Sequence, residues 1–113
     1  MVECLFCKIA EKEIPADIIY EDDMVIAFHD INPQAPKHVL IIPRKHISTL
    51  LEITPEDREI FGHIFNIIPE VVKMIGGEKG FRIVANCLEP AGQSVFHIHF
   101  HLLAGRNFGW PPG

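Results

Sequence analysis

One stretch constrains the fold more than any other: Val95–Leu103, nine residues in which apolar residues alternate with histidines. Successive side chains of a β-strand point to opposite faces, so the alternation predicts a strand with His97, His99 and His101 on one face. Neighbouring imidazoles on such a strand stand about 7 Å apart. The residues of the opposite face are all apolar and are expected to lie in the core: Phe96, Ile98, Phe100 and Leu102.

Three imidazoles in a row contribute little to packing, because each ring needs partners for two nitrogens. Three interpretations remain open: a solvated face, metal binding by alternate histidines, and nucleophilic catalysis by a neutral imidazole. The turn 92–94 just upstream has a Gln amide, a Ser hydroxyl and successive N–H groups that can surround an oxyanion, although an ordinary hairpin loop also explains it. Together, the turn and the strand favour a phosphate cradle beside a nucleophile.

The remaining elements predict an α+β domain with an antiparallel sheet. A long helix is expected from the Thr54-Pro55 cap to Gly76-Gly77, with apolar residues at three- and four-residue spacing and a kink at Pro69. A single domain over residues 1–113 follows from the length. Strands are expected over 18–20, 24–30, 38–43, 81–86 and 94–103, and a short helix over 5–12.

The formal net charge of −5 disfavours binding to a nucleic acid polymer, so any bound phosphate must be held by local donors. No apolar run reaches the roughly 20 residues that span a bilayer. The start, 1–4, lacks the basic region and apolar stretch of a signal peptide, and three cysteines form no closed disulfide framework. A cytoplasmic protein without membrane contact is the expectation.

Cys4-x-x-Cys7 has a spacing found both in metal sites and in redox pairs. Two thiolates are half of a tetrahedral zinc site. The pattern is equally that of two buried small residues on a short helix. A redox pair is disfavoured because no thioredoxin-like βαβ pattern surrounds the cysteines.

The segment 92–103 resembles the signature of the histidine triad (HIT) superfamily, His-x-His-x-His with apolar residues between. Residues 28–31 and 36–47 resemble the first half of that family, and Trp110-Pro111-Pro112-Gly113 resembles its nucleoside phosphoramidase (Hint) branch. The resemblance implies a five-stranded antiparallel sheet with one long and one short helix, and a homodimer. The apolar tail is expected to pack against a second subunit.

The resemblance also implies roles. His99 would attack the α-phosphorus, while His101, His38 and Ser94 would hold the phosphate and help the leaving amine depart. Asp30 would bind the ribose hydroxyls, although an Asp that forms a turn before Asn32-Pro33 is the alternative. The purine pocket is expected to be lined by Phe6, Ile14, Phe28, His29 and Ile31, with Asn86, Gly92 and Gln93 near the phosphate.

Some members of the superfamily hold a structural zinc ion, and the corresponding residues here are Cys4, Cys7, His46 and His97. If the metal is bound, His97 is a ligand and is not catalytic. No cofactor is expected to be required for catalysis.

The function implied is that of a purine nucleoside phosphoramidase, which hydrolyses the P–N bond of adenosine or guanosine 5'-phosphoramidates through a nucleotidyl-histidine intermediate. The expected partner molecules are a purine nucleoside monophosphate or its phosphoramidate. A dinucleoside polyphosphate hydrolase with the same nucleophile is one alternative. A nucleotide-binding regulatory protein with incidental catalysis is another.

Overall fold

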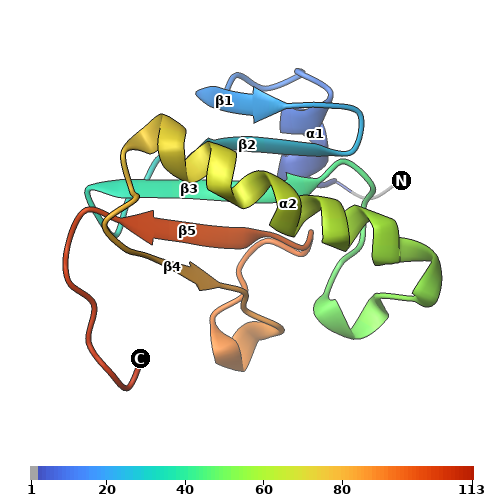
Figure 1. Cartoon of the computed structure of the whole chain (residues 1–113). Helices are drawn as coiled ribbons and strands as arrows, with labels where there is room; N and C mark the ends of the chain where they lie inside the picture. The colour runs from blue at the N-terminus through green and yellow to red at the C-terminus, as the bar shows by residue number, and fades with distance from the viewer. Residues whose placement is uncertain (1–2) are drawn as a thin grey trace.

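The structure, a computed structural model, describes residues 3–113; Met1 and Val2, which belong to the start discussed above, lie outside it. Five strands form one antiparallel sheet in the order β1-β2-β3-β5-β4 (Figure 1). The expected α+β class and five-stranded sheet are confirmed. The strands are β1 (Ile18–Glu21), β2 (Val25–His29), β3 (Lys37–Pro43), β4 (Phe81–Val84) and β5 (Phe100–Ala104).

A short helix, α1 (Leu5–Ala10), and a long helix, α2 (Arg58–Ile75), lie on opposite faces of the sheet (Figure 1). The Thr54 cap leads first into a 3-10 turn, because Thr54 and Asp57 form a capping box, and α2 follows. The helix continues through Pro69 and ends at Gly76, which has φ 71°. That 3-10 turn is Pro55–Asp57, and two others of the same length lie at Leu50–Glu52 and Glu89–Ala91.

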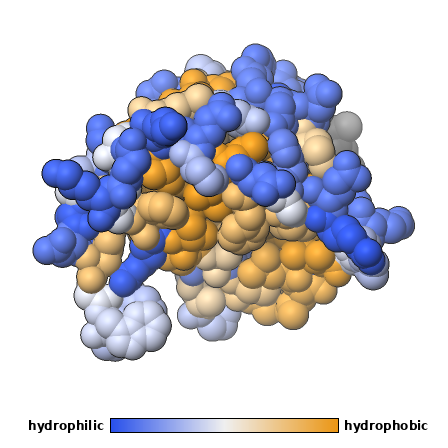
Figure 2. All heavy atoms as spheres, in the orientation of Figure 1, coloured by the Kyte–Doolittle hydropathy of each residue, from blue (hydrophilic) through white to orange (hydrophobic). Residues whose placement is uncertain are grey.

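Alternation along the strands divides the buried residues between two cores. Val39 and Ile41 of β3 face α2, whereas Leu40 and Ile42 face α1. The core against α2 is the larger and contains the apolar stripe of that helix. The outer side of α2 is mixed: charged side chains lie beside the exposed Phe65 and Met74, and hydrophilic and apolar surface alternate over this face (Figure 2). No helix within residues 3–113 is long and apolar enough to cross a membrane.

The histidine segment departs from the expected strand over 94–103. Strand β5 begins only at Phe100, and the preceding residues are irregular. Their backbone follows the loop after β3 instead of a neighbouring strand, since the Ile98 N–H donates to the carbonyl of Ile47 at 2.8 Å. Two expectations are therefore wrong: His97 and His99 are not strand residues, and Phe96 is 44% exposed instead of lying in the core.

Candidate functional site

A pocket of about 410 Å³ opens on the α1 side of the sheet. Its walls come from α1, the ends of β2 and β3, the loop after β2, and the segment that leads into β5. This volume lies within the range of small-molecule sites. Ten of the residues proposed from the sequence line it: Phe6, Ile14, Phe28, His29, Asp30, Ile31, His38, Ser94, His99 and His101.

The pocket has an apolar part and a polar part. Phe6 and Phe28 are buried and meet edge to face, with ring centroids 5.6 Å apart, beside Ile14. Ile31 stands at the rim and is 99% exposed. The polar part contains Ser94 and the histidines together with the Asp30 carboxylate. A ligand with a flat apolar ring at one end and hydrogen-bonding groups at the other matches these walls.

His99 is held in one tautomer by the backbone. Its Nδ1 lies 2.8 Å from the carbonyl oxygen of His97, which can only accept, so Nδ1 carries the proton. The remaining nitrogen, Nε2, therefore keeps its lone pair when the ring is neutral. Burial lowers the pKa of His99 below its ordinary value, although the hydrogen bond to His97 and the charge of Asp30 oppose that effect. A neutral imidazole with a free lone pair is chemically able to act as a nucleophile.

His38 and His101 have the opposite tautomer to His99, with the proton on Nε2 instead of Nδ1. The Gln34 N–H donates to His38 Nδ1 at 3.0 Å, so neutral His38 carries its proton on Nε2. That nitrogen lies 2.9 Å from His101 Nδ1 and 3.4 Å from Asp30 Oδ2. His101 Nδ1 accepts, which leaves its own proton on Nε2. This arrangement suits proton transfer.

The two rings are neutral at pH 7. Burial and the neighbouring His99 and His38 lower the pKa of His101 to about 4. Burial likewise lowers the pKa of His38, against the attraction of Asp30. Asp30 itself serves two purposes: its Oδ1 accepts from the Asn32 N–H at 2.8 Å, as in the turn-forming alternative, and the residue also lines the pocket.

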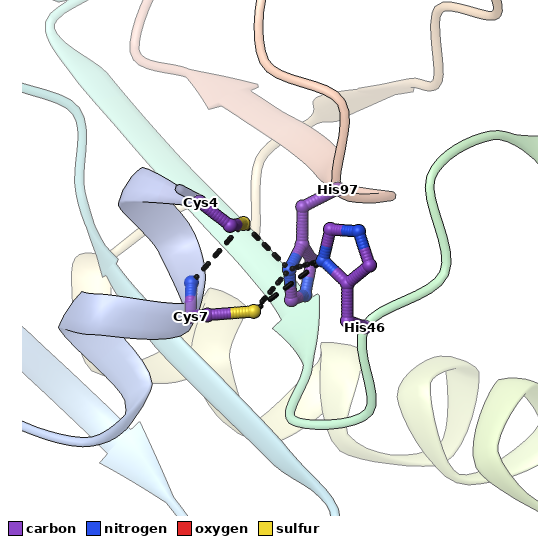
Figure 3. A group of neighbouring side chains, drawn as sticks. All are labelled: Cys4, Cys7, His46 and His97. Atoms are coloured by element: carbon purple, nitrogen blue, oxygen red, sulfur yellow. Dashed lines mark hydrogen bonds between the residues drawn. The ribbon is translucent and has the colours of Figure 1, made fainter. Parts of the chain in front are cut away.

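The four sulfur and nitrogen ligands proposed for zinc come together beside this pocket (Figure 3). Cys4 and Cys7 lie at the start of α1, His46 in the loop after β3, and His97 before β5. The His97 Nδ1 lies 3.3 Å from Cys4 Sγ, 3.5 Å from Cys7 Sγ and 3.3 Å from His46 Nδ1. Cys7 Sγ is 3.3 Å from His46 Nδ1.

These separations fit a tetrahedral ion. Zinc at its usual bond lengths sets nitrogen–nitrogen edges of about 3.3 Å and nitrogen–sulfur edges of about 3.5 Å. The Nε2–H of His97 donates to the Pro43 carbonyl at 2.7 Å, so the His97 Nδ1 offers its lone pair to the cluster. Burial and the adjacent Cys4 raise the pKa of Cys7 to about 11, which favours the protonated thiol. A bound cation would lower that pKa and favour the thiolate that a metal site needs. The donor set fits zinc.

Three residues expected near the phosphate lie outside the pocket walls. The Gln93 amide is occupied internally, because its oxygen accepts from the Leu88 N–H and its nitrogen donates to the carbonyls of Ser48 and Val95. The amide therefore holds the turn and is not free for an oxyanion. Gly92, with φ 104°, does not line the pocket; it borders a neighbouring hollow that shares Ser94 with the pocket. Asn86 packs behind Gly92.

Two backbone groups with a chemical role were not found from the sequence: the Gln34 N–H and the Pro43 carbonyl. Gln34 also lines the pocket. The sequence placed residue 34 in a loop and residue 43 at the end of a strand, which is correct, but the pattern carries no signal for a backbone group that points at an imidazole.

Comparison with known proteins gives a family and close relatives. The model of the HIT domain matches residues 11–108. A solved HIT family hydrolase from Legionella pneumophila Philadelphia 1 is 48% identical, with a TM-score of 0.94, over 98% of this chain and 100% of that one. A 14 kDa zinc-binding protein of Zea mays is 47% identical over 96% of this chain and 87% of its own length.

A solved histidine triad nucleotide-binding protein from Candida albicans is 32% identical, with a TM-score of 0.83, over 96% of this chain and 83% of that one. These relatives share the whole fold and not only the histidine segment. With the family model covering most of the sequence and the histidines placed as described, the chain belongs to the HIT domain family.

Proposed function

We propose that the protein is a purine nucleoside phosphoramidase that hydrolyses the P–N bond of adenosine or guanosine 5'-phosphoramidates. Its relatives include proteins named as a hydrolase and as a nucleotide-binding protein. The observation that carries the proposal is the tautomer of His99. Its buried imidazole lines a pocket of nucleotide size, its Nδ1 holds the proton, and its Nε2 keeps a lone pair.

The pocket walls suit the parts of a purine nucleotide. Phe6 and Phe28 offer apolar faces to the base, and the Asp30 carboxylate accepts from ribose hydroxyls. Ser94 and His101 offer donors to the phosphate oxygens. Because the chain carries a net charge of −5, these local donors supply the attraction for the phosphate.

The reaction has two displacements. In the first, His99 Nε2 attacks the α-phosphorus, the P–N bond breaks, and the departing nitrogen takes a proton from His101 Nε2. An anionic phosphate in the pocket raises the pKa of His101, so His101 takes up a proton from solvent when the substrate binds and then donates it to the departing nitrogen. In the second, water attacks the nucleotidyl-histidine, the bond from phosphorus to His99 breaks, and a proton of the water returns to His101.

Zinc held by Cys4, Cys7, His46 and His97 would be structural, because all four positions are protein ligands. When bound, it supplies a cross-link between segments and no chemistry at phosphorus. This assigns His97 to the metal and leaves the nucleophilic step to His99.

We also propose that the chain is a cytoplasmic homodimer. β4 is an edge strand of the sheet, and an unpaired edge invites a second copy. Phe81 of β4 is exposed, and Trp110 in the tail is 86% exposed. Large apolar side chains exposed in this way are typical of an interaction surface. The cysteines are free thiols, which suits a reducing compartment. Light scattering of the purified protein gives the mass directly.

The test is steady-state hydrolysis of adenosine and guanosine phosphoramidates by the wild type, His99→Ala and the control His63→Ala. His63 lies on the α2 side of the sheet, bonded to Asp22. We expect turnover by the wild type and the control, and a loss of several orders of magnitude for His99→Ala. Cleavage of dinucleoside polyphosphates alone would establish the alternative hydrolase, and AMP binding without turnover would establish a binding protein.

A further inference from the structure

Helix α1 has six residues and depends on its surroundings for stability. Isolated helices of this length do not persist in water, because the first turn is costly to nucleate. Three contacts hold α1 in place. Phe6 and Ile9 are buried against the sheet, the Arg44 guanidinium donates to the Ala10 carbonyl at 2.8 Å, and the cysteines at the N-terminal end meet the two histidines of the metal cluster.

Phe6 lies between the two cysteines and forms a wall of the nucleotide pocket. It is 4% exposed. Its ring meets His99 edge to face at 5.0 Å between centroids and His97 at 6.0 Å. Any movement of the cysteine end of α1 therefore displaces an aromatic wall that touches the nucleophile.

His97 connects the same cluster to the nucleophile by a second route. Its side chain is fully buried, with Nδ1 toward the sulfurs and Nε2–H on the Pro43 carbonyl. Its own carbonyl accepts from His99 Nδ1 at 2.8 Å. One residue thus contributes a metal ligand through its ring and fixes the tautomer of His99 through its backbone.

None of the four cluster residues lines the nucleotide pocket. An effect of the metal on nucleotide binding is therefore indirect, and the contacts above give two routes for it, through Phe6 and through the segment 97–99. We propose that occupancy of the Cys4–Cys7–His46–His97 cluster controls nucleotide affinity: the metal pins Phe6 and the His97 carbonyl, and its removal loosens both. This proposal rests on the proposed function, since it concerns the same nucleotide site.

The test is calorimetric titration of AMP into zinc-loaded, chelator-stripped and reloaded protein. We expect AMP to bind at least tenfold more weakly after stripping and to recover on reloading with zinc. Cys7→Ser is expected to bind AMP weakly whether or not zinc is added. The matched control is Cys87→Ser, because Cys87 is a free cysteine outside the cluster and should respond to zinc as the wild type does.

Hydrogen exchange supplies a readout independent of nucleotide. Stripping is expected to reduce protection of the amides of 5–10 and 97–99 while β2 and β3 stay protected. Loss of protection throughout the sheet would overturn the proposal, because the metal would then hold the whole fold and not the pocket wall. Unchanged exchange in α1 would overturn it as well.

A second variant separates the wall from the ligands. Phe6→Leu keeps all four metal ligands, and in the loaded state it is expected to bind AMP several-fold more weakly and to lose most of its dependence on zinc. Equal AMP affinity of loaded and stripped wild type, within twofold, would overturn the inference and leave the proposed function intact. If loaded wild type binds no AMP at all, the proposed function fails and the inference with it.

Discussion

Two histidine clusters lie side by side on one face of the sheet and use the same residue type in opposite ways. In the first, made of Cys4, Cys7, His46 and His97, the His97 proton points outward to a backbone carbonyl and the lone pair points inward. In the second, made of Asp30, His38 and His101, a backbone N–H donates to His38 Nδ1. The proton of neutral His38 is therefore on Nε2 and points toward His101.

The backbone groups around each imidazole decide its chemistry. When one ring nitrogen donates its proton to a carbonyl outside the cluster, the other nitrogen points into the cluster with its lone pair free to bind a cation. A ring that accepts from an amide presents a proton to its neighbour and opposes a cation at the same point. Geometry alone, with donor atoms of each cluster within 4.8 Å of one another, does not separate a metal site from a proton-transfer site.

The largest expected difference between the two clusters is in metal content. After dialysis, the wild type should retain about one zinc ion per chain, Cys4→Ser/Cys7→Ser none, and Asp30→Asn about one. Structural zinc binding is worth about 10–16 kcal/mol, so the cysteine variant gives the largest effect. Elemental analysis measures the content. Two ions per wild-type chain, reduced to one in Asp30→Asn, would show that the second cluster also holds metal.

The next effect concerns proton transfer. His101→Ala should lower kcat/KM by about 10²–10⁴-fold for a phosphoramidate with an alkylamine leaving group. The loss should be smaller for an aromatic amine, which departs more readily without a proton, and the zinc content should not change. An equal loss with both leaving groups would assign His101 to phosphate binding alone.

Acid stability gives a smaller effect. The pKa of His101 in the folded protein is about 4, and that of His38 is also lowered. Since the unfolded chain titrates near 6.5, the folded protein binds fewer protons between these values. Stability therefore falls as the pH drops through this window, by at most about 1.4 kcal/mol per pH unit for each histidine. Urea unfolding at pH 7 and 5 measures this change in the free energy of unfolding, with a chelator present so that the protein is metal-free at both pH values. His101→Asn should reduce the dependence of that free energy on pH.

His63 provides the smallest effect and the control for both clusters. Its Nε2 lies 2.6 Å from Asp22 Oδ2. Burial alone raises the pKa of Asp22, but hydrogen bonds from His63, Tyr20 and the N–H groups of Met24 and Val25 outweigh it and hold that pKa below its ordinary value. His63→Ala should cost about 1 kcal/mol in thermal unfolding and leave zinc content and AMP affinity unchanged. A change in either would link α2 to the clusters.

Much of the fold follows from local patterns. Alternation places Val39 and Ile41 on one face and Leu40 and Ile42 on the other, as the structure shows, and the Thr54-Pro55 start and Gly76 end of α2 lie within a few residues of expectation. The resemblance to a family named ten residues that line the pocket and four that form the sulfur and nitrogen cluster beside it.

The failures share a physical cause. Period-two alternation does not distinguish a paired strand from an extended segment, so His97 and His99 were placed on a strand although Ile98 bonds to the loop residue Ile47. The use of the Gln93 amide depended on carbonyls distant in the sequence, such as that of Ser48. Tautomers depend on backbone groups like the Gln34 N–H, which every residue type except proline presents equally.

The spacing of the metal ligands has a consequence for the making of the protein. Cys4 and His97 meet across 93 residues of sequence, so their contact closes almost the whole chain into a loop. The cysteines are synthesised before both histidine ligands, and His97 is the last of the four in the sequence. A metal ion that requires all four ligands would therefore bind only after His97 has been made and has folded back onto α1.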